Sequence, residues 1–257
     1  MEDIKCIKQN ATESGDCGNG WEGWRRGNTL YIEYTGPLEY SFQDPYVPDY
    51  LMQIDCWDAA IKTETEILII GNASYVGLSL GVGVFSGWSN LKRIDILTPY
   101  VHYGILDDSD PEEDHYAWNS EDHFVDLLGD LPNLEAVNIL ELEEDDDNMS
   151  EDGIIYDKEC KTLLFCPRGR QGHFSIPEGV EEIDAFAFWK CRNLTSVTIP
   201  NSVKKIDMCA FDGCVSLRLT VPDSVTRIGK DAFEDVPHIL YHGPAQSDDN
   251  WGAKKRN

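Results

Sequence analysis

From residue 176 the chain reads Ile176-Pro177-Glu178-Gly179-Val180-Glu181-Glu182-Ile183, and Ala187-Phe188, Cys191 and Leu194 follow. The same pattern begins again at Ile199-Pro200 and a third time at Val221-Pro222. The prolines Pro177, Pro200 and Pro222 are 23 and 22 residues apart. A repeat with a period in the low twenties is the signature of a solenoid, in which each coil packs only against its neighbours.

The apolar positions of one copy explain why a single coil cannot fold alone. Residues 196–199 alternate polar and apolar, which predicts a short strand, and Pro200 ends the pairing because it lacks an N–H. Phe188 and Cys191 are three residues apart, which suits a short helical turn. A lone coil would expose its apolar row on both sides, so we expect stacked coils with parallel strands about 4.8 Å apart.

The repeat resembles a known bacterial family. Its pattern Ile-Pro-x-x-Val-x-x-Ile, then Ala-Phe-x-x-Cys-x-x-Leu-x-x-Val-x-Ile-Pro, is similar to the BspA-like, or Treponema pallidum-type, leucine-rich repeat over 174–241. The resemblance implies a solenoid between the α/β and mainly-β classes, a right-handed superhelix or horseshoe with short parallel strands. It also implies a binding role of the protein-interaction or adhesion type. Ser202 and Ser224 lie near the place of the consensus Asn, so we expect no asparagine ladder.

Weaker copies upstream extend the repeat and give the organisation of the chain. Two segments, from Phe85 to Ile96 and from Leu128 to Ile139, carry apolar residues at the same spacing, and Leu68 with Ile70 would supply an earlier strand. We expect one elongated domain of five or six coils. Its predicted parts are an N-terminal cap (1–66), a solenoid (67–241) with an insertion at 97–127 and a hairpin at 152–167, and a C-terminal cap or tail (242–257).

The N-terminal cap is predicted to be rich in β-structure. Residues 27–36 alternate apolar and polar between two glycines, which is typical of a strand. Terminal coils need a cover because their apolar end would otherwise face water. We therefore expect the nearby aromatic residues to form cap core rather than a ligand box; these are Trp21, Trp24, Tyr31, Tyr34 and Tyr40.

The chain is strongly acidic, and its charge is uneven. Its 21 basic and 47 acidic residues give a net charge of −26, with no Lys or Arg between Ile94 and Asp157. Acidic runs at 107–114 and 141–147 would repel nucleic acid and anionic membranes, so neither is an expected partner. These runs serve solubility or attract a cationic partner. A calcium loop does not fit, because Met149 takes the place of an oxygen ligand.

Motifs for catalysis are missing from the sequence. It contains no Gly-x-Ser-x-Gly, phosphate loop, His-Glu-x-x-His or glycine-rich dinucleotide turn. We therefore expect a non-enzymatic protein without cofactor or metal. The alternative is a carbohydrate-active or metal-dependent enzyme with its site in the acidic insertion at 97–126, where His102, His115 and His123 lie among carboxylates.

Candidate partner-binding residues follow from the strand register. If Val197 and Ile199 point inward, alternate residues of each strand point outward and can hold a peptide or glycan. Two aromatic residues of the insertion are added because long loops in a repeat array often project from the binding face. The predicted binding residues are Arg93, Asp95, Asn138, Ser196, Thr198, Arg218, Thr220, Tyr116 and Trp118.

The cysteines and the N-terminal sequence indicate in which cellular compartment the protein is expected. Cys191 and Cys214 take equivalent places in adjacent coils and are predicted to be reduced and buried. Cys160 and Cys166, or Cys6 and Cys17, could pair under oxidising conditions. The sequence contains no apolar run long enough to span a membrane and no N-terminal signal peptide, which predicts a cytoplasmic protein. We also expect a monomer. If a leader was removed, the protein is instead secreted or on the cell surface. The expected partner is a protein or glycan.

Overall fold

The structure of the chain is a computed structural model that describes residues 4–16, 20–35, 59–71, 78–80, 85–97, 101–103, 124–140, 148–245 and 251–252. Its contacts separate two compact units. The N-terminal unit holds Met1–Asp122 with Ile139–Asp146, and the C-terminal unit holds His123–Asn138 with Asp147–Asn257. The division into caps at 1–66 and 242–257 and a solenoid at 67–241 remains a prediction.

The N-terminal unit is built on a mixed sheet with the order β1-β2-β3-β4-β6. The pairs β1–β2 and β2–β3 are antiparallel, whereas β3–β4 and β4–β6 are parallel; β5 and β7 form a separate parallel pair. Its elements are α1 (Ile4–Gln9), β1 (Glu13–Asp16), β2 (Trp21–Arg26), β3 (Thr29–Tyr34), α2 (Ala59–Glu64), β4 (Ile67–Gly71), β5 (Leu78–Leu80), β6 (Arg93–Leu97) and β7 (Val101–Tyr103).

Alternation along the strands gives this sheet two faces. On one face Leu30, Leu68 and Ile94 form a buried row, and Leu68 and Ile94 belong to the weaker upstream copies of the repeat. The predicted strand at 27–36 is β3, and a two-residue turn at Gly27-Asn28 joins it to β2. Gly27 has φ of 60°, which the first position of a type II′ turn requires.

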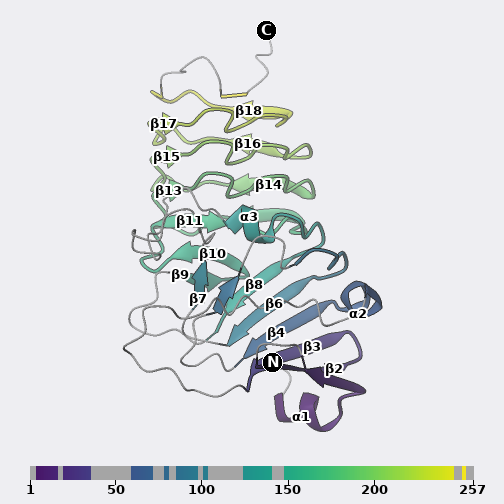
Figure 1. The fold of residues 1–257 in the computed structure, drawn as a ribbon. Coiled ribbons are helices and arrows are strands. Elements are labelled where there is room, and N and C mark those ends of the chain that lie inside the picture. The colour runs from purple at the N-terminus through teal and green to yellow at the C-terminus, as the bar shows by residue number, and fades with distance from the viewer. Residues whose placement is uncertain are drawn as a thin grey trace, which may run out of the picture. The chain divides into compact units, whose positions relative to one another are not determined.

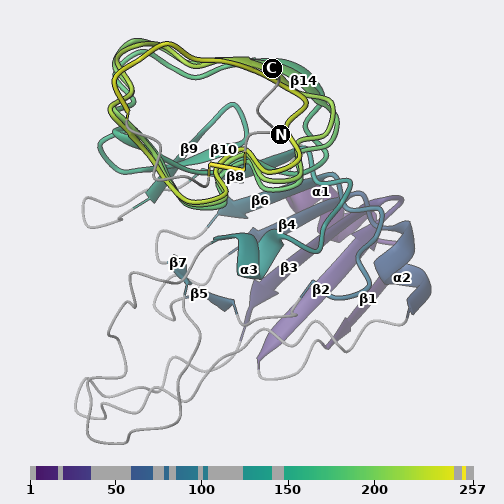
Figure 2. The same ribbon diagram turned by 90° about the horizontal axis from the view of Figure 1, so that it is seen from above.

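The C-terminal unit is a stack of coils, each of which contributes one short strand to each of two parallel columns (Figure 1). One column is β11-β13-β15-β17 and the other is β12-β14-β16-β18; seen along the stack, these coils superimpose (Figure 2). The elements of the unit are α3 (Phe124–Leu128), β8 (Ala136–Ile139, whose last residue belongs to the N-terminal unit), β9 (Asn148–Glu151), β10 (Ile154–Asp157), β11 (Thr162–Phe165), β12 (Gly172–Ser175), β13 (Glu182–Ile183), β14 (Leu194–Thr198), β15 (Lys205–Ile206), β16 (Arg218–Thr220), β17 (Arg227–Ile228) and β18 (His238–Leu240).

The parallel register repeats the sequence period. Val197 pairs with Leu219, which pairs with Ile239, while Ile183 pairs with Ile206 in the other column. Each coil therefore places its apolar strand residues directly against those of the next coil. The predicted solenoid with short parallel strands is confirmed.

The predicted hairpin is present, and the structure adds a strand to it. β10 and β11 are antiparallel, with the polar turn between Asp157 and Thr162, as expected. β9 pairs with β10 through a two-residue turn at Asp152-Gly153, where φ is 50° and 76°. β9 was not predicted, because the expected hairpin began only at residue 152, although Asp-Gly is a strong signal for a type I′ turn.

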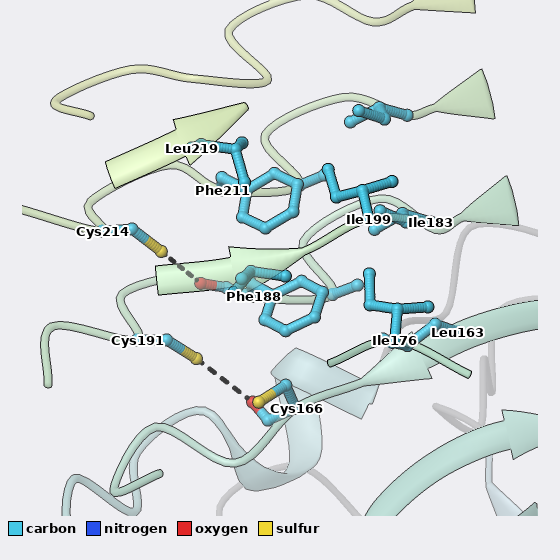
Figure 3. Packing of buried hydrophobic residues seen from close by; sticks show 14 of the residues in the cluster. Leu163, Cys166, Ile176, Ile183, Phe188, Cys191, Ile199, Phe211, Cys214 and Leu219 are labelled. Atoms are coloured by element: carbon cyan, nitrogen blue, oxygen red, sulfur yellow. Dashed lines mark hydrogen bonds between the residues drawn. The ribbon is translucent and has the colours of Figure 1, made fainter. Parts of the chain in front are cut away.

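A column of aromatic rings fills the centre of the coils. Phe188, Phe211 and Phe233 are fully buried and stacked, with ring centroids 4.7 Å and 5.9 Å apart. Figure 3 shows two of these rings, one above the other, beside the buried thiols of Cys191 and Cys214. The two cysteines are free, as predicted, and the Cys214 thiol donates to the Phe188 carbonyl at 3.0 Å.

Two positions in each of the three coils have a left-handed backbone. The first set is Phe186, Cys209 and Asp231, with φ of 59°, 52° and 54°. The second set is Lys190, Gly213 and Asp235, with φ of 56°, 75° and 60°. Hydrogen bonds between coils fix these turns; for example, the Phe188 N–H donates to the Ala210 carbonyl at 2.7 Å. The sequence period is thus also a period of backbone conformation.

The C-terminal coil is covered by described residues of the segment that follows it. In the earlier coils the equivalent N–H donates to a carbonyl of the next coil. The Phe233 N–H instead donates to the Trp251 carbonyl at 2.8 Å. The Trp251 ring meets Tyr241 edge to face at 5.5 Å, and the Tyr241 hydroxyl donates to the Val225 carbonyl. These contacts shield the apolar end of the stack, as a solenoid requires.

Candidate partner-binding face

The strands β12, β14, β16 and β18 present an outward surface that we call the open face. Register aligns its eight positions in two rows that run along the stack. The first row is His173, Ser196, Arg218 and His238; the second is Ser175, Thr198, Thr220 and Leu240. All eight side chains are exposed or partly exposed. The alternate residues, such as Phe174 and Val197, are buried and hold the strands against the core.

His173 links the two rows. Its Nδ1 lies 2.8 Å from the Ser196 Oγ, and its Nε2 lies 2.9 Å from the Ser175 Oγ. A histidine that activates a serine for catalysis is normally oriented by a third group, usually a carboxylate on its other nitrogen. Both ring nitrogens here face hydroxyls, so the arrangement orders a polar surface and does not form a catalytic triad.

The open face differs in charge from the rest of the chain. None of its eight positions carries a carboxylate, although the chain has a net charge of −26. The guanidinium of Arg218 forms neither an ion pair nor a hydrogen bond with the described residues. Arg218 is therefore free to pair with a partner, and the hydroxyls of Thr198 and Thr220 flank it on the neighbouring row.

The structure brings together four of the predicted binding residues and leaves others elsewhere. Register pairs Ser196 with Arg218 and Thr198 with Thr220. Asn138 lies on β8 with a partly exposed side chain. Tyr116 and Trp118 lie outside the described residues, as does most of the insertion at 97–127 that contains them.

Arg93 and Asp95 have a different environment. They lie on β6 and pair with each other, with Arg93 Nε 3.1 Å from Asp95 Oδ2. Asp95 is 3% exposed, so it is not available to a partner in this conformation. On this face Ile69, the register neighbour of Asp95, packs in one apolar cluster with Ile7 of α1. The expectation of an outward and accessible Asp95 therefore needs correction, because α1 packs on this side of the sheet.

Sequence reasoning missed half of the open face. His173 and Ser175 lie just before the first copy of the repeat at Ile176, and His238 and Leu240 lie at the end of the third copy. The signal for them was present, because extending the two-residue alternation by one coil in each direction reaches all four. Leu240 is 52% exposed and adds an apolar contact at one end of the face.

The other column of strands carries a paired set of charges around Lys205 of β15. Lys205 Nζ lies 2.7 Å from Glu182 and 2.5 Å from Asp207. Burial alone would lower the pKa of Lys205, but the hydrogen bonds to Asp207 and Glu182 raise it. Asp184 completes a group of three carboxylates that are close enough together to hold a metal ion. Lys205 already supplies the positive charge in that group.

Buried thiols account for further pKa shifts. Burial raises the pKa of Cys191 and of Cys214 well above the usual value, so both remain protonated and unreactive at neutral pH. Cys160 and Cys166 are free and not paired, and the Cys160 thiol lies 3.0 Å from the Met149 sulfur. Cys6 is also free, and Cys17, considered as its partner under oxidising conditions, lies outside the described residues.

The coils, their parallel strands and the buried aromatic column define a leucine-rich repeat solenoid. Residues 164–241 match the family model described as "BspA type Leucine rich repeat region", which confirms the resemblance expected from the repeats. No helix in the described ranges has both the length and the apolar character needed to cross a membrane. The comparison with curated proteins found no match.

Several solved structures are similar to this chain. A leucine-rich repeat protein from Eubacterium ventriosum is 13% identical, with a TM-score of 0.41 over 91% of this chain and 73% of that one. The pneumococcal vaccine antigen PcpA is 12% identical, with a TM-score of 0.39 over 89% of this chain and 82% of its own. A leucine-rich cell surface protein from Faecalibacterium prausnitzii is 17% identical, with a TM-score of 0.29 over 95% and 98%.

Proposed function

We propose that the protein is a non-enzymatic binding scaffold whose open face contacts a protein segment or a glycan. The observation that carries this proposal is the pair of aligned rows, in which Arg218 lies among hydroxyl groups. Arg218 makes no ion pair with a described residue, and none of the eight positions of the face is an acidic residue. Hydroxyls and a guanidinium can donate to the carbonyl, hydroxyl or carboxylate oxygens of such a partner. Repeat stacking aligns the rows along the stack, so they can bind an extended chain.

The charge distribution supports a partner that is neutral or anionic at this face. Elsewhere on the chain the excess of acids would repel an anionic ligand. Arg218 and the two histidines of its row instead favour a neutral or anionic partner at this face. A cationic partner, if one exists, would bind the acidic segments at 107–114 and 141–147, which lie outside the described residues.

Photo-crosslinking from the open face identifies the partner. A photoreactive phenylalanine is placed at Thr198 on the face or at Thr226 near the other strand column, and both positions are exposed. We expect capture of the same species repeatedly from Thr198 and not from Thr226. Equal capture from the two positions would remove the assignment of this face.

Binding of the captured partner is then measured with matched charge reversals. Arg218→Glu changes the open face, whereas Arg227→Glu changes an exposed arginine on β17 of the other column. We expect Arg218→Glu to weaken binding about tenfold or more, equivalent to about 1.4 kcal/mol, and Arg227→Glu to leave it unchanged. An unchanged affinity for Arg218→Glu would contradict the proposal.

A further inference from the structure

A lysine of α1 lies in a cage of aromatic rings and a carboxylate in the N-terminal unit. The Lys8 ammonium is 4.3 Å from the centre of the Trp24 ring and 5.4 Å from that of Tyr31. It also forms an ion pair with Glu33, whose side chain is only 12% exposed. Two rings and a shielded carboxylate around one ammonium group are the features of a cation-recognition site.

The strands position the cage. Trp24 of β2 and Tyr31 of β3 are register partners, and their rings lie 5.9 Å apart. The Tyr31 hydroxyl donates to Glu33 Oε2 at 2.5 Å and so orients the carboxylate. Gly71 of β4 makes room for the Tyr31 ring, because a Cβ there would lie 2.6 Å from the Tyr31 hydroxyl oxygen. The cage residues thus come from paired strands, whose register sets their relative positions.

The helix that fills the cage is a small element. α1 has six residues, far fewer than an isolated helix needs to be stable in water. Ile4 and Ile7 dock it on an apolar cluster with Tyr31 and Ile69. The Lys8 side chain remains 32% exposed, so the cage opens toward solvent.

We propose that Trp24, Tyr31 and Glu33 form a binding site for a primary alkylammonium group, the end of a lysine side chain, which Lys8 occupies in cis. A lysine carried by a short amphipathic segment of a partner protein would compete for the same site. The compact ammonium fits between two rings and one carboxylate, whereas the planar guanidinium of arginine favours stacking or bidentate pairing. The net charge of −26 would attract such a basic segment.

Chemical rescue tests the cage. Lys8→Met keeps the aliphatic stem and removes the ammonium, which leaves Glu33 shielded without its cation. We expect n-butylammonium chloride to raise the thermal midpoint of this variant by about 2–4 °C more than sodium chloride of equal ionic strength. The double variant Lys8→Met with Glu33→Gln should show no difference between the two salts. An equal response of the single and double variants, or no response of a folded single variant, would overturn the proposal.

A second measurement uses the unmodified protein and so does not depend on the folding of a variant. A peptide of residues 4–10 is added at several millimolar, the effective concentration of a short linked segment. The indole N–H resonance of Trp24 is followed by NMR. We expect it to shift with this peptide and not with the same peptide carrying leucine in place of Lys8. Identical shifts with both peptides, or no shift with either, would count against the site.

Discussion

Phe188 and Phe211 stack almost face to face, with centroids 4.7 Å apart and ring planes inclined by only 8°. The two rings belong to adjacent coils and occupy the same place in the repeat. Each coil therefore contributes one ring to a continuous column, and the ring of Phe211 is covered on both sides, by Phe188 and by Phe233. The contact that joins one coil to the next is thus a direct consequence of the sequence period.

Removal of the central ring should be costly. Phe211→Ala leaves a cavity with Phe rings on two sides, and we expect it to lower the free energy of unfolding by about 3–5 kcal/mol. Val215→Ala in the same coil, at a side chain that is 48% exposed, should change it by less than about 0.5 kcal/mol. Urea unfolding followed by circular dichroism measures both. Similar losses for the two variants would show that the ring column is not the main contact between coils.

Stability should fall at alkaline pH because of the buried thiols. Cysteines in the unfolded chain ionise near their ordinary pKa of 9.0, whereas burial holds the pKa of Cys191 and Cys214 well above it. Above pH 9 the folded state therefore binds more protons than the unfolded state, and each thiol reduces stability by up to about 1.4 kcal/mol per pH unit.

The pH dependence is checked by unfolding between pH 7 and pH 10. The double variant Cys191→Ala with Cys214→Ala should show a shallower decline above pH 9 than the parent chain. Val203→Ala removes buried apolar atoms without removing a titrating group, so it should keep the parent slope. The idea fails if the cysteine variant retains that slope.

Replacement of Gly213 should destabilise the protein, although the equivalent positions of the neighbouring coils carry Lys190 and Asp235. Its φ is 75°, and an added Cβ would meet the Lys190 side chain at 2.9 Å. Gly213→Ala therefore adds left-handed strain and a close contact, and we expect a loss of about 1–2 kcal/mol. Asp235→Gly, at the equivalent exposed position with φ of 60°, should lower the midpoint little or raise it. Thermal melting of both variants distinguishes these outcomes.

Lys205 should stabilise its column by separating carboxylates. Lys205→Met leaves Glu182, Asp184 and Asp207 close together without a cation, and we expect a loss of about 1 kcal/mol at pH 7. The loss should shrink as the pH falls and the carboxylates become protonated. Lys161→Met breaks only an exposed pair with Glu181 and serves as the control, with no measurable change expected. A pH-independent loss for Lys205→Met would point to lost packing instead.

The sequence predicted the coils because each repeated apolar residue contacts its own equivalent one coil away. The inward direction of Val197 sets that of Leu219, and the outward direction of Thr198 and Thr220 follows. Half of the open face could be predicted for this reason. His173 and His238 could have been predicted as well, by extending the same register by one strand in each direction.

Features that depend on contacts outside the repeat could not be predicted. Asp95 occupies an outward position by register, yet it is buried on the side of the sheet where α1 packs, and α1 has no repeat relationship to β6. The lysine cage likewise pairs Lys8 with Glu33, which is 25 positions away in the sequence. This contact forms only because α1 packs on the sheet, and no local sequence pattern predicts it. The aromatic residues were expected to be cap core, and Tyr31 is indeed buried.

Hydroxyl-radical footprinting of the protein with its captured partner tests most directly whether the open face binds. Leu240 lies on the face and is 52% exposed, whereas Met208 and Val215 lie in the turns of the same stack and are 40% and 48% exposed. Binding at the open face predicts that the partner reduces the labelling of Leu240 and His173 and leaves Met208 and Val215 unchanged. Protection of Met208 and Val215, with Leu240 and His173 still labelled as in the free protein, would contradict it.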